Sequence, residues 1–360
     1  MSNILNRRTL LSTTGSALLL TQLPIPVLAK STERFKKSDP VEKIKKNSGD
    51  WKTWKIITKL APMEPVSSVL LPLPRLSETT YQNFLDLQIK GNFESTQIVK
   101  DSIYGATGLI AKFAKTSAPT FELELTVQTR NRVAPEPLSV NEDVGLYLKA
   151  TKNMPTEGLV KQTAKKIVQN KKNTEEQAFA IYNWIIDNTF RDPNVKGCGL
   201  GDINNMLATG NLGGKCADIN SLFVGLCRSV GIPAREAYGI RVGDSEQYKS
   251  IGKSGVVSKA QHCRAEFFNE KKGWIAVDPA DVRKVILEEK LNLEDPKIQE
   301  LRKKFFGFWE MNWVNYNNAR DFKFSQIDKE FNYLMYPQSI GAKLNNLNPD
   351  EFKYSIEVLS

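Results

Sequence analysis

The stretch GGKCADINSLFVGLCRSVGIPAR, residues 213–235, decides the fold of this 360-residue chain. From Cys216 onward, apolar side chains recur at helical spacing, which predicts one buried helical face: Ile219, Leu222, Phe223, Leu226 and Val230. Gly231 is expected to end this helix, and Pro233 prevents its continuation. Because the paired glycines before Cys216 permit a tight turn, Cys216 is predicted to lie in the first turn of the helix.

A cysteine in a first helical turn is suited to nucleophilic chemistry. Unpaired backbone N–H groups and the helix dipole favour an anion there, which lowers the pKa of a thiol. The same N–H groups can hold the oxyanion of a tetrahedral intermediate. Cys227, deep in the same helix beside the apolar face, is interpreted as a core residue. For Cys216 itself, the helix alone leaves a buried structural role open.

His262, the only histidine of the chain, is the candidate base. It lies in QHCRAEFF (261–268), and GWIAVDPAD (273–281) follows after a polar turn, so a β-hairpin is expected. If opposed residues have position numbers that sum to 540, His262 faces Asp278. An even sum needs a loop with an odd number of residues or a bulge, for which Gly273 is well placed. An odd sum would put the side chains of His262 and Asp278 on opposite faces of the hairpin.

In this arrangement His262 takes the thiol proton, while Asp278 fixes the imidazole tautomer and stabilises the imidazolium. Asp281 is the competing acid, but it follows Pro279, where the strand should end, so Asp278 is favoured. Cys263 is expected to point to the other face of the strand and to pack there. No cofactor or metal is expected, because the four cysteines and the histidine contain no C-x₂-C pair of the kind that binds zinc.

These segments resemble the transglutaminase-like superfamily, part of the wider papain-like group of cysteine enzymes. The resemblance rests on three motifs in a fixed order across roughly residues 160–285: Gly214-Lys215-Cys216 before an apolar helix, Gly231-Ile232-Pro233-Ala234-Arg235 before a strand, and His262 followed by Gly273-Trp274-Ile275-Ala276-Val277-Asp278-Pro279. It implies an α+β core in which a nucleophile helix packs on an antiparallel sheet. It also implies that Cys216 is the nucleophile, His262 the base and Asp278 the orienting acid.

Two positions bear on how closely the chain follows this family. Arg264 stands shortly after the histidine, where the family often has an aromatic residue, so the substrate preference is expected to differ. Family members also take a second oxyanion donor from an upstream side chain, for which Asn211 is a candidate.

Residues 1–29 are predicted to be a signal peptide. The paired Arg7 and Arg8 precede a mild apolar run, and Val27 and Ala29 suit a cleavage site, a pattern that resembles a bacterial twin-arginine signal. An ordinary secretory signal or an uncleaved anchor is the alternative. Cleavage after Ala29 removes two arginines and leaves a charge of 10 − 2 = +8. The mature protein is therefore expected to be periplasmic or secreted, with no membrane-spanning segment.

The remaining chain divides into four parts. Residues 30–50 are expected to form a polar linker, and residues 51–140 a small β-rich domain, because segments 84–91 and 121–128 alternate with period two. Residues 141–290 are the predicted catalytic domain, which includes a helix with Thr174 as N-cap and Gln177 completing a capping box. Residues 291–360 are expected to be an extension packed on the catalytic domain.

The composition fits a soluble globular protein, with 41% hydrophobic and 25% charged residues and a formal net charge of +10. Because the lysines are spread along the chain, no nucleic-acid partner is expected. The leading hypothesis is an exported thiol enzyme that acts on an amide in a peptide or protein through a thioester, with water as the acceptor. Transfer of the acyl group to an amine, and a non-catalytic peptide-binding module of the same fold, are the alternatives.

Overall fold

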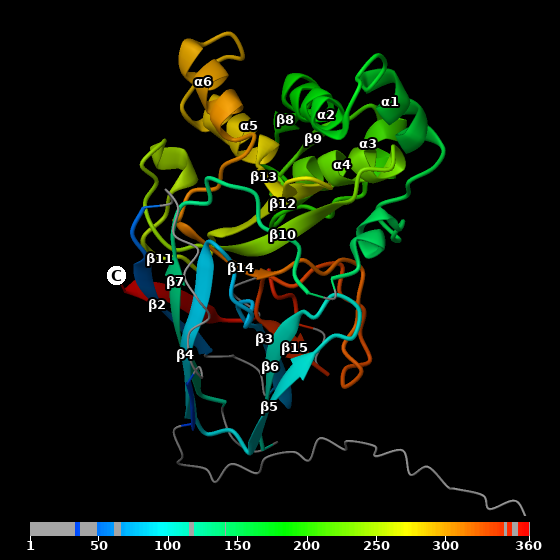
Figure 1. The fold of residues 1–360 in the computed structure, drawn as a ribbon. Coiled ribbons are helices and arrows are strands. Elements are labelled where there is room, and N and C mark those ends of the chain that lie inside the picture. The colour runs from blue at the N-terminus through cyan, green and yellow to red at the C-terminus, as the bar shows by residue number, and fades with distance from the viewer. Residues whose placement is uncertain are drawn as a thin grey trace, which may run out of the picture.

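The computed structural model describes residues 33–36, 49–60, 66–114, 119–140, 142–341, 344–347 and 352–359. The predicted signal peptide and most of the predicted linker lie outside these residues. In Figure 1 the helices gather over one face of a central sheet, and further β-sheets lie below it.

The β-rich region consists of two antiparallel sheets. The larger has the strand order β1-β4-β7-β2-β16-β11, and the smaller has the order β15-β3-β6-β5. The strands run β1 Glu33–Lys36, β2 Lys52–Leu60, β3 Ser68–Pro72, β4 Gln82–Gly91, β5 Ser95–Lys100, β6 Thr107–Lys112, β7 Phe121–Thr129, β11 Gly255–Val256, β15 Gln338–Ile340 and β16 Tyr354–Leu359. The two alternating segments of the sequence lie in β4 and β7, and every second residue of β7 is buried. The predicted β-rich region is thus confirmed.

The two sheets enclose one apolar core that extends into the rest of the molecule. Trp54 and Ile56 of β2 and Leu125 of β7 belong to it, together with Ile240 and Val314 of the central sheet. The β-rich region is therefore packed against the central sheet through shared apolar side chains.

The central sheet and its helices form the second part of the fold. The sheet has the order β13-β12-β10-β14, with β10 Ala234–Arg241, β12 Gln261–Asn269, β13 Gly273–Val277 and β14 Trp313–Asn317. The helices run α1 Leu159–Ile167, α2 Thr174–Asn188, α3 Ile203–Thr209, α4 Cys216–Ser229, α5 Pro279–Glu288 and α6 Pro296–Lys304, with short 3₁₀ turns at Val144–Leu148 and Lys249–Ile251. A two-residue parallel pair, β8 Phe190–Arg191 and β9 Gly213–Gly214, precedes α4. This arrangement is the predicted α+β class.

Helix α4 begins at Cys216 and ends before Gly231, as predicted. Gly231 has a φ of +84°, and the Ile232 N–H donates to the Cys227 carbonyl at 3.0 Å, which closes the helix end. The prediction of a single buried face was too narrow, since every residue of α4 is buried. Helices α1, α2 and α3 cover the sides of α4 that do not face the central sheet (Figure 1).

Two local predictions need correction. The N-cap of α2 is Asn173 and not Thr174, because the Asn173 side chain accepts from the Glu176 N–H at 2.9 Å. Glu176 in turn accepts from the Lys172 N–H, so the capping residues are shifted by one position. In addition, residues 33–36 of the predicted linker form strand β1, which pairs antiparallel with β4.

The C-terminal segment packs on both parts of the molecule. Strand β14 pairs with β10 in the central sheet, whereas β15 pairs with β3 and β16 pairs with β2 in the β-rich region. Residues 291–360 therefore hold the two parts together. Within the described residues, no helix combines the length and the apolar character that crossing a membrane requires.

Candidate active site

The structure brings Cys216, His262 and Asp278 together at the start of α4. Cys216 is the first residue of the helix. The Nε2 atom of His262 lies 2.8 Å from the Oδ2 atom of Asp278. Cys216 and His262 both line a cavity of about 770 Å³, so a molecule in that cavity can reach the thiol.

In the hairpin that carries the histidine, the position numbers of opposed residues have an even sum, as predicted. The register itself differs from the predicted one. Asn269 pairs with Gly273 and Ala265 with Val277, so opposed positions sum to 542 and not to 540. The loop between the strands has three residues, and Gly273 has a φ of +95°. Because the sum is even, the two segments keep the shared face that the site requires.

Asp278 reaches His262 from a helix cap and not from a paired strand position. Strand β13 ends at Val277, and Asp278 is the N-cap of α5. One carboxylate oxygen, Oδ1, accepts from the Asp281 N–H at 3.1 Å, which leaves Oδ2 for the imidazole. The Pro279 that follows thus begins a helix, where its missing N–H costs nothing.

The competing acid, Asp281, is also buried near the imidazole but has a different partner. Its Oδ1 lies 3.5 Å from His262 Nε2 and 2.5 Å from the Arg241 guanidinium. Burial would raise the pKa of Asp281, but Arg241 outweighs it and holds this pKa well below its usual range. Asp278 is therefore the carboxylate that hydrogen-bonds His262, and Asp281 is a second fixed negative charge.

These charges decide the protonation of the imidazole. Burial and the Arg241 charge both lower the pKa of His262, but Asp281 and Asp278 outweigh them, so this pKa is raised above its ordinary value of 6.5. Burial, followed by the Asp281 charge, raises the pKa of Asp278. A protonated imidazole beside an ionised thiol is the state that this arrangement favours.

Two further cysteines contact Cys216, which no motif in the sequence indicated. Hydrogen bonds from Cys198 first, and then from Cys263, lower the pKa of the Cys216 thiol well below its usual value in spite of burial, and His262 adds to the effect. The Tyr336 hydroxyl donates to the Cys198 sulfur at 3.1 Å. The Cys198 thiol has two acceptors within reach, the Gln261 carbonyl at 3.4 Å and the Cys216 sulfur, and the Tyr336 hydroxyl orients it.

The other expectations for the cysteines hold in part. Cys263 is packed in the core as predicted, but α4 covers that face of β12, so its thiol also reaches Cys216. Cys227 is a core residue as predicted, and burial raises the pKa of its thiol well above the usual value. All four cysteines are free thiols.

The glycine-rich segment 197–201 is fixed by one carboxylate. Asp218, in the first turn of α4, accepts from the N–H groups of Leu200, Gly201 and Lys215 at 2.8 to 3.0 Å. Gly199 has a φ of +92°, and a Cβ there would lie 1.8 Å from an Asp218 oxygen. This contact positions Cys198, whose carbonyl accepts from the Ala217 N–H at 2.9 Å.

Residues 161–279, which contain all of these groups except Asp281 and Tyr336, match the family model described as the transglutaminase-like superfamily. The chain therefore contains a transglutaminase-like domain. An uncharacterized protein of Haemophilus influenzae is 38% identical to it over 80% of this chain and 85% of that protein.

Two solved structures are also similar to this chain. A provisionally assigned cysteine protease from Cytophaga hutchinsonii is 16% identical, with a TM-score of 0.49 over 86% of this chain and 99% of the other. The periplasmic domain of TgpA from Pseudomonas aeruginosa, bound to ethylmercury, is 15% identical, with a TM-score of 0.35 over 62% and 88% of the two chains.

At the position where members of this superfamily often have an aromatic residue, the transglutaminase-like domain has a buried cation. The Arg264 guanidinium lies 4.7 Å from the ring centre of Trp313 on β14. The Trp313 indole N–H donates to the His262 carbonyl at 2.9 Å. An aromatic ring thus packs beside the histidine strand, but a strand outside the matched segment supplies it.

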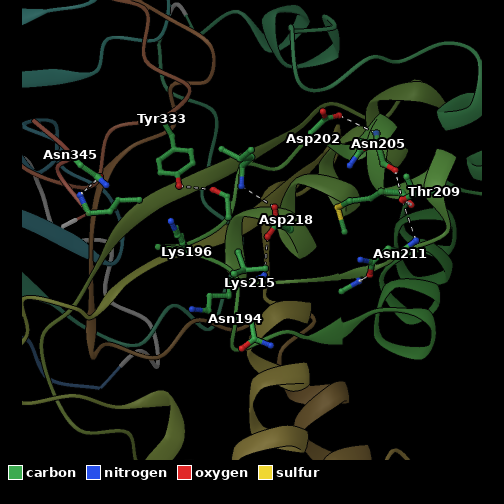
Figure 2. Close-up of a pocket in the computed structure, with 17 residues that line it drawn as sticks. Asn194, Lys196, Asp202, Asn205, Thr209, Asn211, Lys215, Asp218, Tyr333 and Asn345 are labelled. Carbon is green, nitrogen blue, oxygen red and sulfur yellow. Dashed lines mark hydrogen bonds between the residues drawn. The ribbon is translucent and has the colours of Figure 1, made fainter. Parts of the chain in front are cut away.

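The backbone at the start of α4 offers one oxyanion donor. Within the described part of the chain, no acceptor contacts the Cys216 N–H, whereas the Lys215 and Ala217 N–H groups are both occupied. The candidate second donor, Asn211, is exposed, and its Oδ1 accepts from the Gly213 N–H at 3.1 Å. Figure 2 shows Asn211 in an adjoining groove, and it does not line the cavity beside Cys216.

One group of side chains at the site has the spacing of metal ligands. Single atoms of His262, Asp278 and Asp281 lie within 4.8 Å of one another. However, Arg241 contacts Asp281 at 2.5 Å, and Arg264 lies 3.6 Å from Asp278. The protein itself therefore already supplies positive charge to both carboxylates.

Proposed function

We propose that this protein is a cysteine-dependent hydrolase of amide bonds in peptides or proteins, with Cys216 as nucleophile, His262 as acid and base, and Asp278 as the orienting group. The single observation that carries the proposal is that Cys216 and His262 line the same cavity, with Asp278 at 2.8 Å behind the imidazole. The shifted pKa values of the thiol and the imidazole support an ion pair there.

In the first half of the reaction, the Cys216 thiolate attacks the amide carbonyl carbon, and the carbonyl oxygen becomes an anion beside the Cys216 N–H. The carbon–nitrogen bond then breaks as the His262 imidazolium gives its proton to the leaving amine, and an acyl thioester remains on Cys216. In the second half, neutral His262 takes a proton from water, whose oxygen attacks the thioester. Release of the carboxylic acid restores the thiolate and the imidazolium.

Asp278 keeps its negative charge throughout this sequence. Because its Oδ2 accepts from Nε2, the other imidazole nitrogen faces the thiol, as proton transfer requires. Water is proposed as the acceptor, since the described lining of the cavity has six cationic side chains and no carboxylate to receive a protonated amine. We also propose that the protein acts in the periplasm or outside the cell, on the basis of the paired arginines and apolar run in residues 1–29.

A peptide library derived from a digested proteome tests this proposal, with monodansylcadaverine added as a primary amine. The proposal predicts new peptide termini in the presence of the protein, and no activity for Cys216→Ala. Cys227→Ala is the matched control, because it removes the same atoms from the same helix away from the cavity and should retain activity. Labelling of peptides by the amine without cleavage would favour acyl transfer, and no reaction at all would favour a binding module.

A further inference from the structure

The cavity beside Cys216 is strongly basic. It is lined by six cationic side chains, and among its described lining residues there is no aspartate or glutamate. The cations come from β8, the start of α4, the end of β10, the loop before β12 and α5: Arg191, Lys215, Arg241, Lys253, Lys259 and Lys284. Lysines that look scattered in the sequence therefore converge on one cavity in the fold.

Only part of this positive charge is balanced by the protein. Arg241 pairs with Asp281 at 2.5 Å, and Lys284 lies 3.9 Å from Glu288. The other four cations, Arg191, Lys215, Lys253 and Lys259, have no ion-pair partner among the described residues. Lys253 and Lys259 are exposed, and Arg191 and Lys215 are partly buried, so all four can meet a molecule that enters from solvent.

Stabilisation of the thiolate does not account for this charge. The largest contributions to the low pKa of Cys216 are hydrogen bonds from Cys198 and Cys263, followed by those of His262. The unpaired cations therefore remain to act on whatever occupies the cavity. Several like charges around a concave site raise the local concentration and association rate of ligands of opposite charge.

The groove that adjoins the cavity has a different character. It has a volume of about 950 Å³ and shares Gly197, Lys215 and Leu347 with the basic cavity. Figure 2 shows it lined largely by uncharged polar side chains, among them Asn194, Asn205, Thr209 and Asn211. Its two carboxylates already accept hydrogen bonds: Asp202 caps α3, and Asp218 holds three backbone N–H groups. Two cations, Lys196 and the shared Lys215, also line the groove, but most of the positive charge lies on the cavity side of Cys216.

We propose that the substrate is an acidic peptide, whose carboxylates bind the cations of the cavity while its uncharged backbone extends into the adjoining groove. The proposal rests on the proposed function for the identity of the substrate as a peptide. The attraction of the cavity for anions, however, does not depend on that function, so the two can be tested separately.

The first experiment compares two alkylating reagents of nearly equal size that differ in charge. Rates of Cys216 modification by iodoacetate, an anion, and by neutral iodoacetamide are measured by peptide mass spectrometry at low salt. In water, a unit charge about 8 Å from a reacting anion changes its rate by roughly twofold, and 0.1 M salt screens much of this effect. The ratio of iodoacetate to iodoacetamide rates should therefore fall about fourfold in the double variant Lys253→Gln/Lys259→Gln.

The control removes two lysines that line neither cavity. Lys165 and Lys166 are exposed in the last turn of α1, and the double variant Lys165→Gln/Lys166→Gln should leave the rate ratio unchanged. Since His262 is intact in every variant, its own charge cannot explain a difference between them. An equal ratio in wild type and in Lys253→Gln/Lys259→Gln would overturn the proposal that the cavity selects anions.

The second experiment identifies the class of substrate. Cleavage is measured on paired synthetic peptides that carry Glu or Gln, and Asp or Asn, around each scissile bond found in the peptide library. The acidic member of a pair should be cleaved at least several-fold faster, with an advantage that shrinks in 0.5 M salt and in the cavity variant. Equal cleavage of both members would overturn the acidic-peptide proposal. A charge-dependent alkylation ratio without any cleavage would overturn the proposed function and, with it, the identification of the substrate as a peptide, but not the selection of anions by the cavity.

Discussion

Replacement of Cys198 by alanine should raise the pKa of the Cys216 thiol, although Cys198 is not expected to react with substrate. Cys198 is buried between the Tyr336 hydroxyl and the Cys216 sulfur, and its hydrogen bond is the largest single cause of the low pKa of Cys216. A methyl group donates no hydrogen bond, so the thiolate would lose one of its donors. The neutral thiol would lose much less.

The size of the effect follows from the strength of such a contact. A hydrogen bond to a charged group contributes about 1.5–3 kcal/mol, and 1.36 kcal/mol corresponds to one pKa unit. The pKa of Cys216 should therefore rise by roughly one to two units in Cys198→Ala. Cys198→Ser retains an O–H donor and should restore most of the wild-type value.

The assay is the rate of Cys216 alkylation by iodoacetamide as a function of pH, with the modified peptide identified by mass spectrometry. Cys227→Ala is the matched control, because it makes the same truncation in the same core and leaves the donors of Cys216 intact. A pH profile of Cys198→Ala that superimposes on wild type, in a protein that remains folded by thermal melting, would refute the role assigned to Cys198.

Three further predictions concern stability and export. Cys227→Ser should lower the free energy of unfolding by about 1–3 kcal/mol, because it places a hydroxyl in an apolar core, and urea unfolding measures this; an unchanged midpoint would contradict the core assignment. Burial would raise the pKa of Glu266, but Arg235 and Arg132 outweigh it and lower this pKa from 4.5 to about 2. The stabilisation that ionised Glu266 contributes is therefore complete above pH about 4.5 and is lost as the pH falls through about 2. This loss lowers the free energy of unfolding by roughly 3 kcal/mol. Glu266→Gln should abolish that acid-dependent step in urea unfolding between pH 2 and 6, and an unaltered pH profile would contradict the buried pairing. Finally, Arg7→Lys with Arg8→Lys should leave an unprocessed cytoplasmic precursor in cell fractionation, whereas normal processing would point to the general secretory route.

The sequence was sufficient to predict those features that depend on local patterns. The start of α4 at Cys216 and its end before Gly231 follow from glycine placement and apolar spacing, and β7 follows from strict alternation. Asp278 could be chosen over Asp281 because of its place in the hairpin, although it acts from the cap of α5. The register could not be fixed, since sums of 540 and 542 place the same residues on the same face.

Contacts between distant segments could not be predicted from the sequence. Cys198 and Tyr336 are 138 positions apart and meet only because the C-terminal segment returns to the start of α4. The six cations of the cavity come from five separate elements, so no run of charge marks them in the chain. One local signal was available: Asp218, two residues after the cysteine and close to a glycine-rich segment, is suited to accept backbone N–H groups from it.

The central claim is that His262 and Cys216 form an ion pair, and proton NMR of the imidazole tests it most directly. Because the chain has one histidine, a single set of ring resonances reports on this residue alone. Before treatment, the imidazole should titrate above pH 6.5, as Asp281 and Asp278 require. After Cys216 is alkylated with iodoacetamide, the anion is gone, so the pKa should fall, with the carboxylates retaining part of the shift. An imidazole that titrates at its ordinary value and does not respond to alkylation would contradict the account and favour a binding module of the same fold.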